Sequence, residues 1–184
     1  MFVETCIKLA AEGRGSNQAL ADELMSADLS DLHKLLEDTM AGPITTPSAA
    51  KMAESVRAVF NVNAKAMQML PSDGEPFSIR KWVRGTCGPG SLLFLSARYV
   101  DMSVLSQLLT LWLDTAINTL MTGRRTRDLK LWFLIDELGA LHRLPSLEKG
   151  LQTARNFGGA IVTGVHAFAK LFYRGDVILS ELPG

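Results

Sequence analysis

The chain has 184 residues, of which 47% are hydrophobic and 21% charged, so it can bury a core and is not a disordered polypeptide. The formal net charge is zero, which excludes a strongly basic protein whose overall charge alone would predict nucleic-acid binding. The charge is uneven, however: residues 1–75 carry 6 basic and 11 acidic side chains, and residues 76–184 carry 13 and 8. We therefore expect two modules, an all-α segment over 1–75 and a second domain over 76–184.

Cysteines and apolar runs exclude several other classes of protein. The two cysteines, Cys6 and Cys87, lie far apart and predict neither a disulfide framework nor a zinc site. The N-terminus lacks the basic start and apolar core of a signal peptide. The most apolar long run, Val104–Met121, contains Asp114 and Asn118 four residues apart, so it predicts an amphipathic helix and not a transmembrane segment.

The first half of the sequence has the 3.6-residue periodicity of helices and no strand signal. Glycine and proline divide it into expected helices over residues 2–12, 17–25, 30–40 and 46–70. Met52, Met67 and Met69 are interpreted as core residues of the last of these. The run 71–76, Pro-Ser-Asp-Gly-Glu-Pro, predicts a linker.

The second half alternates between short apolar strands and helices. Strands are expected over Ser91–Leu95, Leu129–Ile135 and Ala160–Val165. Helices are expected over residues 101–121, 147–157, where Gly158-Gly159 ends the helix, and 167–172. Strands that alternate with crossover helices predict an α/β fold with a parallel sheet.

Two carboxylates follow the second expected strand directly. Leu131 to Ile135 is apolar, and Asp136 and Glu137 come next. The carboxyl ends of parallel strands are where α/β folds bind ligands. An aspartate there can hold Mg²⁺, and a following glutamate can polarise a water for attack on a γ-phosphate. The alternative is a strand that ends in an ordinary polar turn.

The residues downstream resemble a known family. The run continues through Leu-Pro-Ser-Leu, then Ala-Arg155-Asn-Phe-Gly-Gly, then Ile-Val-Thr-Gly-Val-His166. It resembles the coupling proteins of bacterial conjugation, the TraD and TrwB group of type IV secretion, which are hexameric DNA pumps related to the FtsK motors. The resemblance is most specific from Trp132 to Phe168. It implies a partial RecA-like parallel-sheet motor domain with its Walker B motif over 76–184, preceded by a small all-α segment like the family's inserted domain.

The resemblance implies a role for each matched residue. Asp136 would be the magnesium-side carboxylate that helps to bind ATP, and Glu137 the water-activating one. Arg155 would be an arginine finger that reaches the neighbouring subunit's site, and the alternative is a solvated arginine at a helix end. His166 stands where the family has a glutamine that senses the γ-phosphate. A neutral imidazole can donate one such hydrogen bond, and the alternative is a histidine at a strand end.

A phosphate-binding loop is missing from the sequence. The glycine-rich run Gly85–Ser91 has no lysine, contains a proline and precedes an expected strand instead of following one. We therefore expect a partial chain that carries one half of an ATP and Mg²⁺ site. Such a chain resembles an ATPase and DNA translocase but should not hydrolyse ATP alone.

The partners implied by the resemblance are DNA, the relaxosome and its relaxase, and the type IV secretion channel. The intact family protein would be a homo-hexamer at the cytoplasmic face of the bacterial inner membrane, and this chain would contribute no transmembrane segment. Two alternatives remain: a non-catalytic interaction module or truncated remnant that binds a relaxosome protein or DNA, and an unrelated α/β enzyme. The basic run Arg124–Lys130 is either a contact for DNA phosphates or a solvated turn.

Overall fold

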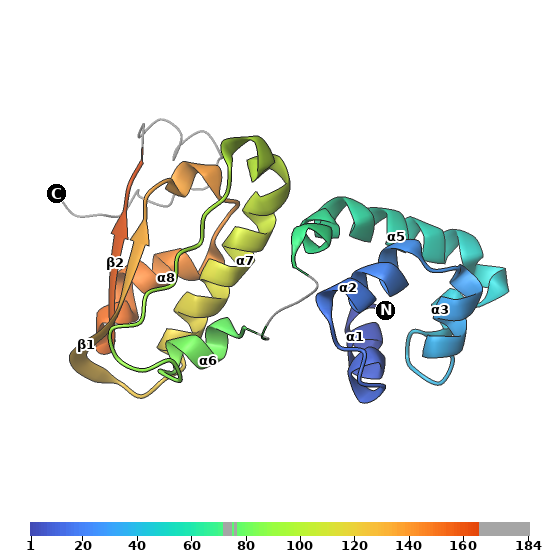
Figure 1. Ribbon diagram of the computed structural model, residues 1–184, viewed down its shortest axis with the longest axis horizontal. Helices are drawn as coiled ribbons and strands as arrows, with labels where there is room; N and C mark the ends of the chain where they lie inside the picture. The colour runs from blue at the N-terminus through green and yellow to red at the C-terminus, as the bar shows by residue number, and fades with distance from the viewer. Residues whose placement is uncertain (72–74, 76, 166–184) are drawn as a thin grey trace. The chain divides into compact units, whose positions relative to one another are not determined.

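A computed structural model describes residues 1–71, 75 and 77–165 (Figure 1). The chain divides into two compact units, Met1–Glu75 and Pro76–Gly184.

The first unit is built from helices, and its described residues contain no strand. Its elements are α1 (Phe2–Ala11), α2 (Asn17–Ala21), η1 (Asp22–Ser26, a π-helical turn), α3 (Leu29–Leu36), α4 (Gly42–Thr45), η2 (Pro47–Ala49), α5 (Ala50–Ala64) and η3 (Lys65–Met69). The Oγ of Ser16 accepts a hydrogen bond of 3.1 Å from the backbone N–H of Ala19, so Ser16 caps α2 and Asn17 is the first helical residue.

Leucines of η1 and α3 form the core of this unit. Leu24, Leu32 and Leu36 are fully buried, and Leu32 and Leu36 lie four residues apart on one face of α3. The ring of Phe60 from α5 packs against this cluster and lies 5.4 Å from the ring of Phe2. The four-residue spacing of Leu32 and Leu36 therefore places both side chains in the core, whereas Met40, beyond the end of α3, is 91% exposed.

The methionines of α5 and η3 correct one expectation. Met52 and Met69 are 56% and 47% exposed, so two of the three side chains assigned to the core lie on the surface. The reason is that α5 buries the small side chain of Ala53 and half-buries Phe60, which occupy a narrow stripe facing the core. Only Met67 is half-buried among these three.

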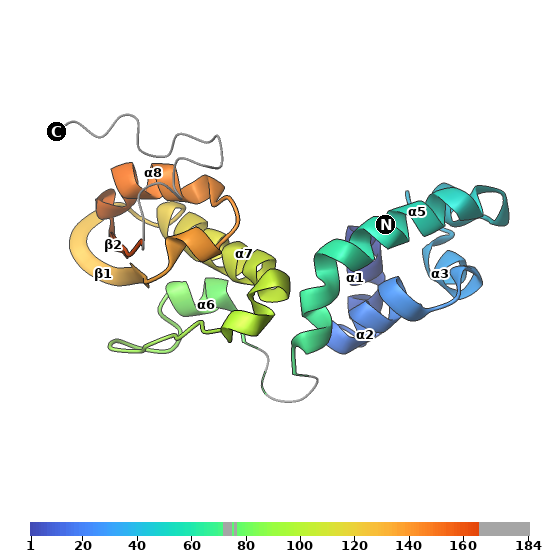
Figure 2. The same ribbon diagram turned by 90° about the horizontal axis from the view of Figure 1, so that it is seen from above.

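The second unit combines helices with a small parallel sheet (Figure 2). Its elements are α6 (Ile79–Val83), η4 (Tyr99–Asp101), α7 (Met102–Met121), β1 (Thr126–Ile135), η5 (Leu138–Ala140), α8 (Pro145–Thr153), η6 (Ala154–Asn156) and β2 (Phe157–Thr163). The strands β1 and β2 pair in parallel, and α8 lies in the crossover between them, as expected from the sequence.

Helices α7 and α8 cover one face of this sheet. Phe133 and Ile135 of β1 point to that face and are buried with Ile117 of α7 and Leu147 of α8. The alternate residues of β1 point to the other face, where Trp132 is 57% and Leu134 is 75% exposed. The apolar strand is therefore buried on one side only, although its composition resembles that of a strand buried on both.

Two sequence expectations for this unit differ from the structure, and a third lies outside the described residues. The segment Ser91–Leu95 is expected to be a strand, but residues 91–98 have no regular secondary structure. Leu93 and Leu95 line a cavity together with residues of β1. Because the cavity lies between this segment and β1, the segment does not pair with β1 in a ladder. The pair Gly158-Gly159 lies inside β2, and the helix before it, α8, has already ended at Thr153. The helix expected over 167–172 lies outside the described residues.

Within the described residues, no helix is both long and apolar enough to cross a bilayer. The longest, α7, has 20 residues but carries polar side chains through its length.

Candidate functional site

Asp136 and Glu137 follow the carboxyl end of β1, where the backbone is held to β2. Ile135 pairs with Thr163 in the last step of the ladder. Beyond it, the N–H of Gly164 donates to the carbonyl of Ile135 at 2.6 Å, and the N–H of Leu138 donates to the carbonyl of Gly164 at 3.1 Å. These two hydrogen bonds fix the backbone on both sides of the carboxylates.

Gly164 is required at this point by close packing of the backbone. A Cβ at position 164 would lie 2.4 Å from the carbonyl oxygen of Asp136, a contact that no larger residue could make without moving the loop. The motifs of the sequence do not single out this glycine as a site residue. The signal that could have found it is its place one residue beyond the end of β2, where the loop after β1 passes closest.

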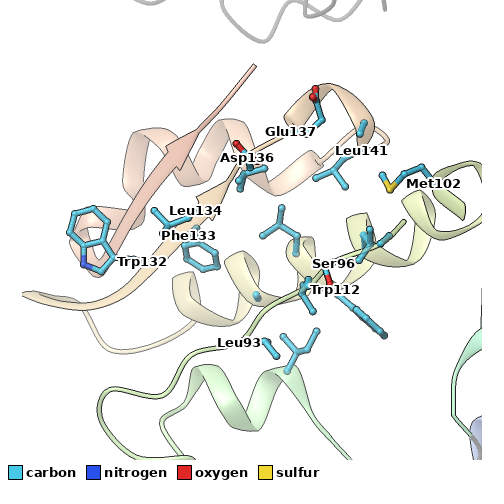
Figure 3. Close-up of a pocket in the computed structure, with 18 of the residues that line it drawn as sticks. Leu93, Ser96, Met102, Trp112, Trp132, Phe133, Leu134, Asp136, Glu137 and Leu141 are labelled. Carbon is cyan, nitrogen blue, oxygen red and sulfur yellow. The ribbon is translucent and has the colours of Figure 1, made fainter. Parts of the chain in front are cut away.

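A cavity of about 410 Å³ opens beside the two carboxylates (Figure 3). Its walls come from β1, α6, α7 and the irregular segment 93–97, and they are mainly apolar. Trp132, Leu134 and Leu93 are among the apolar side chains of this wall, and Asp136 and Glu137 are its charged residues. No lysine or arginine lines the cavity, so its described lining provides no cation for a phosphate group.

The carboxylates fit the metal side of a nucleotide site. Asp136 is exposed and Glu137 is half-buried, and Mg²⁺ is usually bound by one or two carboxylates together with waters and substrate phosphates. In the described part of the chain, no group of three or more His, Cys, Asp or Glu side chains could enclose a metal ion. The arrangement therefore suits a metal that is shared with a ligand and not one held by this chain alone.

Arg155 lies at the other end of the sheet. It belongs to η6, immediately before β2, and is exposed. Since β2 has seven residues, Arg155 and the carboxylates are separated by about 23 Å along the strand direction. The structure therefore does not bring Arg155 and Asp136 together within one chain. His166, the fourth residue of the expected site, lies outside the described residues.

The basic run is at the same end of the sheet as Arg155. Arg124 and Arg125 precede β1, and Arg127 and Lys130 belong to its first half. All four side chains are exposed. The guanidinium carbon of Arg125 lies 6.0 Å from the centre of the Phe157 ring, where β2 begins.

Comparison with known proteins matches this arrangement to one family over nearly the whole chain. The sequence model of one protein family, described as the type IV secretion-system coupling protein DNA-binding domain, matches residues 1–174. The chain belongs to this family. The family resemblance drawn from the acidic strand and the residues after it is therefore confirmed.

Individual relatives agree with the family assignment. Coupling protein TraD of Escherichia coli (strain K12) is 33% identical over 176 residues, which are 93% of this chain and 24% of TraD. Solved structures of the coupling protein TrwB, one of TrwBdeltaN70 in complex with sulphate and another in complex with ADP and Mg²⁺, are 30% identical and have TM-scores of 0.74. Each comparison covers 91% of this chain and 40% of the TrwB chain.

The likeness to TrwB confirms the fold class as a partial α/β motor domain with a preceding helical segment. This coupling-protein chain spans about a quarter of TraD and two fifths of the solved TrwB chains. TrwB has also been solved with a non-hydrolysable ATP analogue, so nucleotide binding is a property of that relative.

Proposed function

We propose that this chain is part of a conjugative coupling protein, a DNA-pumping ATPase that links the relaxosome to the type IV secretion channel. In this proposal, residues 76–184 carry the Walker B half of the motor domain and residues 1–75 correspond to the family's inserted all-α domain. The observation that carries the proposal is the fixed pair Asp136–Glu137 at the carboxyl end of β1, in a chain whose family includes nucleotide-bound TrwB.

The two carboxylates divide the chemistry between them. Asp136, which is exposed, would hold Mg²⁺, directly or through water, and the metal would neutralise phosphate charge when it is bound. Glu137 is half-buried and heads η5, so its side chain is more restricted and suits the orientation of an attacking water. The cations for the phosphates would come from outside the cavity described above, because none lines it.

Arg155 would complete the site of a neighbouring copy. Its distance from Asp136 rules out a direct contact in one subunit, and a homo-hexameric ring would present the amino end of one sheet to the carboxyl end of the next. The exposed, planar guanidinium could then stabilise charge that develops on the transferred phosphoryl group. His166 would act as the γ-phosphate sensor. The intact assembly would work at the cytoplasmic face of the bacterial inner membrane, with DNA and a relaxase as partners.

The first test uses the 184-residue chain alone with ATP and Mg²⁺. We expect no turnover above background and no rise in melting temperature with nucleotide, because the phosphate-binding half is absent from the sequence. Metal-dependent turnover that Glu137→Gln abolishes would contradict the proposal that this chain carries only half of a site.

The second test places these residues in a complete motor. Residues 1–174 replace the matching segment of Escherichia coli TraD, and ATP hydrolysis and plasmid transfer are measured. Glu137→Gln should lower hydrolysis by about 100-fold or more while nucleotide binding persists. Glu148→Gln, an exposed glutamate of α8, is the matched control and should leave hydrolysis within about twofold. Equal effects of the two changes would favour the non-catalytic interaction module.

A mixing experiment tests whether Arg155 acts on a neighbouring copy. The Glu137→Gln and Arg155→Ala versions of this chimera are each expected to be inactive. Mixed rings would contain some interfaces with an intact Glu137 from one subunit and an intact Arg155 from the next, so hydrolysis should partly recover. The doubly substituted chimera is the control, since it supplies neither group. Failure of the two single variants to recover in rings shown to be mixed would reject the role in trans.

A further inference from the structure

The exposed cations at the amino end of β1 form a surface that the ATP site does not use. We call Arg124, Arg125, Arg127 and Lys130 the amino-end basic surface. These four cations and one acid, Asp128, lie within seven residues, which gives the run a net charge of +3. The surface is at the opposite end of the sheet from Asp136 and Glu137, so it is separate from the carboxylate site.

The pairing of the two strands pushes this surface out of the sheet. Thr126 pairs with Phe157 and Leu131 pairs with Gly159, so five steps along β1 face two steps along β2. The three additional residues form a bulge between these two pairs, and bulges redirect side chains away from the ladder. Arg127 and Lys130 belong to the bulged segment, which therefore presents cations away from the ladder.

Packing against the start of β2 holds two of the cations in place. Arg125 lies over the ring of Phe157, at 6.0 Å from its centre. The stem of Lys130 passes Gly158 so closely that a Cβ at 158 would be 3.1 Å from its Cγ. Because these stems are packed, their charged ends lose less conformational freedom when they bind a ligand.

Charge neutralisation within the chain does not explain the cluster. Asp128 is the one acidic residue of the run. It is hydrogen-bonded to Thr126: the backbone N–H of Asp128 donates to Oγ1 of Thr126 at 3.1 Å, and the Thr126 hydroxyl donates to the Asp128 carboxylate at 3.4 Å. The ion pairs found among the described residues involve Lys8, Arg14, Lys34 and Arg98, and include none of the four cations. The surface is therefore available to an external anion with several charges.

We infer that the amino-end basic surface binds the sugar-phosphate backbone of DNA. The inference rests on the proposed function, because it takes DNA as the partner, and it identifies the residues that bind it. Because residues 126–131 face only two steps of β2, the run is shorter than an extended strand and gathers its cations over a small surface that can meet neighbouring phosphates of one strand. Guanidinium groups bind phosphate oxygens in a bidentate manner, and three of the four cations are arginines. Backbone phosphates carry no base readout, so binding should not depend on sequence.

The test is fluorescence anisotropy of a labelled 30-nucleotide single strand of mixed sequence, titrated with the 184-residue chain over a range of salt concentrations. The variant Arg124→Gln/Arg127→Gln changes the two side chains for which the structure shows no packing role. It should weaken binding by about tenfold at 0.1 M salt. It should also reduce the slope of log K against log salt by about 1.4, because each phosphate that the variant no longer neutralises accounts for about 0.7.

Two further variants separate charge from folding. Lys51→Gln/Lys149→Gln removes the same charge from exposed sites on α5 and α8 and should change affinity by less than about twofold. Arg124→Lys/Arg127→Lys keeps the charge, so it should retain the salt slope and lose less affinity than the glutamine pair, because a lysine neutralises a phosphate but cannot bind it in a bidentate manner. Circular dichroism melts of all three should agree with that of the parent chain.

Several results would overturn the inference. One is an equal decrease of DNA affinity in Arg124→Gln/Arg127→Gln and in the control Lys51→Gln/Lys149→Gln. Another is an unchanged affinity and salt slope in Arg124→Gln/Arg127→Gln. A third is no binding of the DNA strand by the parent chain at 0.02 M salt. A decrease that affects only binding to vesicles of phosphatidylglycerol and phosphatidylcholine would assign the surface to a membrane and also reject DNA. None of these results bears on Glu137, whose role is tested by ATP hydrolysis, so the two proposals fail separately.

Discussion

Oδ1 of Asp114, in the middle of α7, accepts a hydrogen bond of 2.9 Å from the backbone N–H of Ser146 in the first turn of α8. The second carboxylate oxygen accepts from the side chain of Asn118 at 2.9 Å. Asp114 thus caps α8 from a neighbouring helix, since the residue at the N-cap position, Leu144, has no side-chain acceptor. This bond also anchors the loop that leaves the carboxylate site, because α8 follows η5.

Removal of this carboxylate should destabilise the second unit. Asp114→Ala is expected to lower its free energy of unfolding by about 1–2 kcal/mol, because a buried helix end loses both an acceptor and a favourable charge. Asp114→Asn keeps one oxygen and should cost about half as much. All three tryptophans, Trp82, Trp112 and Trp132, lie in this unit, so urea unfolding followed by tryptophan fluorescence measures it selectively.

The matched control for this experiment is Gln152→Ala on the exposed side of α8. It should change the free energy of unfolding by less than about 0.5 kcal/mol. A destabilisation by Asp114→Ala no larger than that of the control would show that the cap does not stabilise α8.

The two faces of β1 should respond differently to truncation. Phe133→Ala removes a side chain buried between the sheet and the helices, and it should cost about 3–5 kcal/mol in the same tryptophan-monitored unfolding. Leu134→Ala removes a neighbouring side chain that is 75% exposed, and it should change stability by about 0.5 kcal/mol or less. Similar destabilisation by both substitutions would mean that a further layer covers Leu134 in solution.

The sequence predicts the elements whose pattern depends on local residues. The helix α7 begins within one residue of the expected position and ends as expected. The strand β1 ends at the expected Ile135 but begins three residues earlier, and β2 begins three residues earlier and ends two residues earlier than expected. Their order and the crossover helix are enough to give a parallel sheet. The acidic pair at the end of β1 also follows from local pattern, because a strand that ends in carboxylates is visible without knowledge of any neighbour.

Features that depend on distant residues are not predicted or are predicted wrongly. Ser91–Leu95 has the composition of a strand, but a strand also needs a paired neighbour, which composition cannot supply. The spacing of Asp114 and Asn118 indicates a polar stripe, but nothing in their own helix shows that the N-terminus of α8 lies opposite. The bulge in β1 arises from the register with β2 and has no signal in β1 alone.

The carboxyl of Asp38 provides a test by pH. Its oxygens lie 2.6 and 2.7 Å from Nζ of Lys8, and this hydrogen bond holds the pKa of Asp38 below its usual value. Because the folded-state pKa is lowered, the carboxylate contributes stability at and above the pH where an unfolded aspartate titrates. That contribution is lost as the pH falls through the lowered folded pKa.

Carboxyl NMR titration measures this shift directly. Asp38 should titrate at higher pH in the Lys8→Gln chain than in the parent, and 0.5 M NaCl should reduce the difference, because the pair is exposed. Lys34→Gln, which removes the cation of another exposed pair, should leave the titration of Asp38 unchanged. An identical titration of Asp38 in the parent and Lys8→Gln chains would show that the ion pair does not persist in solution.

Gly158 should tolerate substitution less well than Gly85, although both have positive φ angles, +79° and +87°. A Cβ at Gly85 would meet open space, so Gly85→Ala carries only the conformational cost of about 1–2 kcal/mol. At position 158 the Cβ would also lie 2.4 Å from the carbonyl oxygen of Asp128, which is backbone and cannot rotate away. Gly158→Ala must therefore shift the bulge, and we expect a further destabilisation of about 1–3 kcal/mol in tryptophan-monitored unfolding. If the two substitutions cost the same, the close approach of Asp128 to β2 is not maintained in solution.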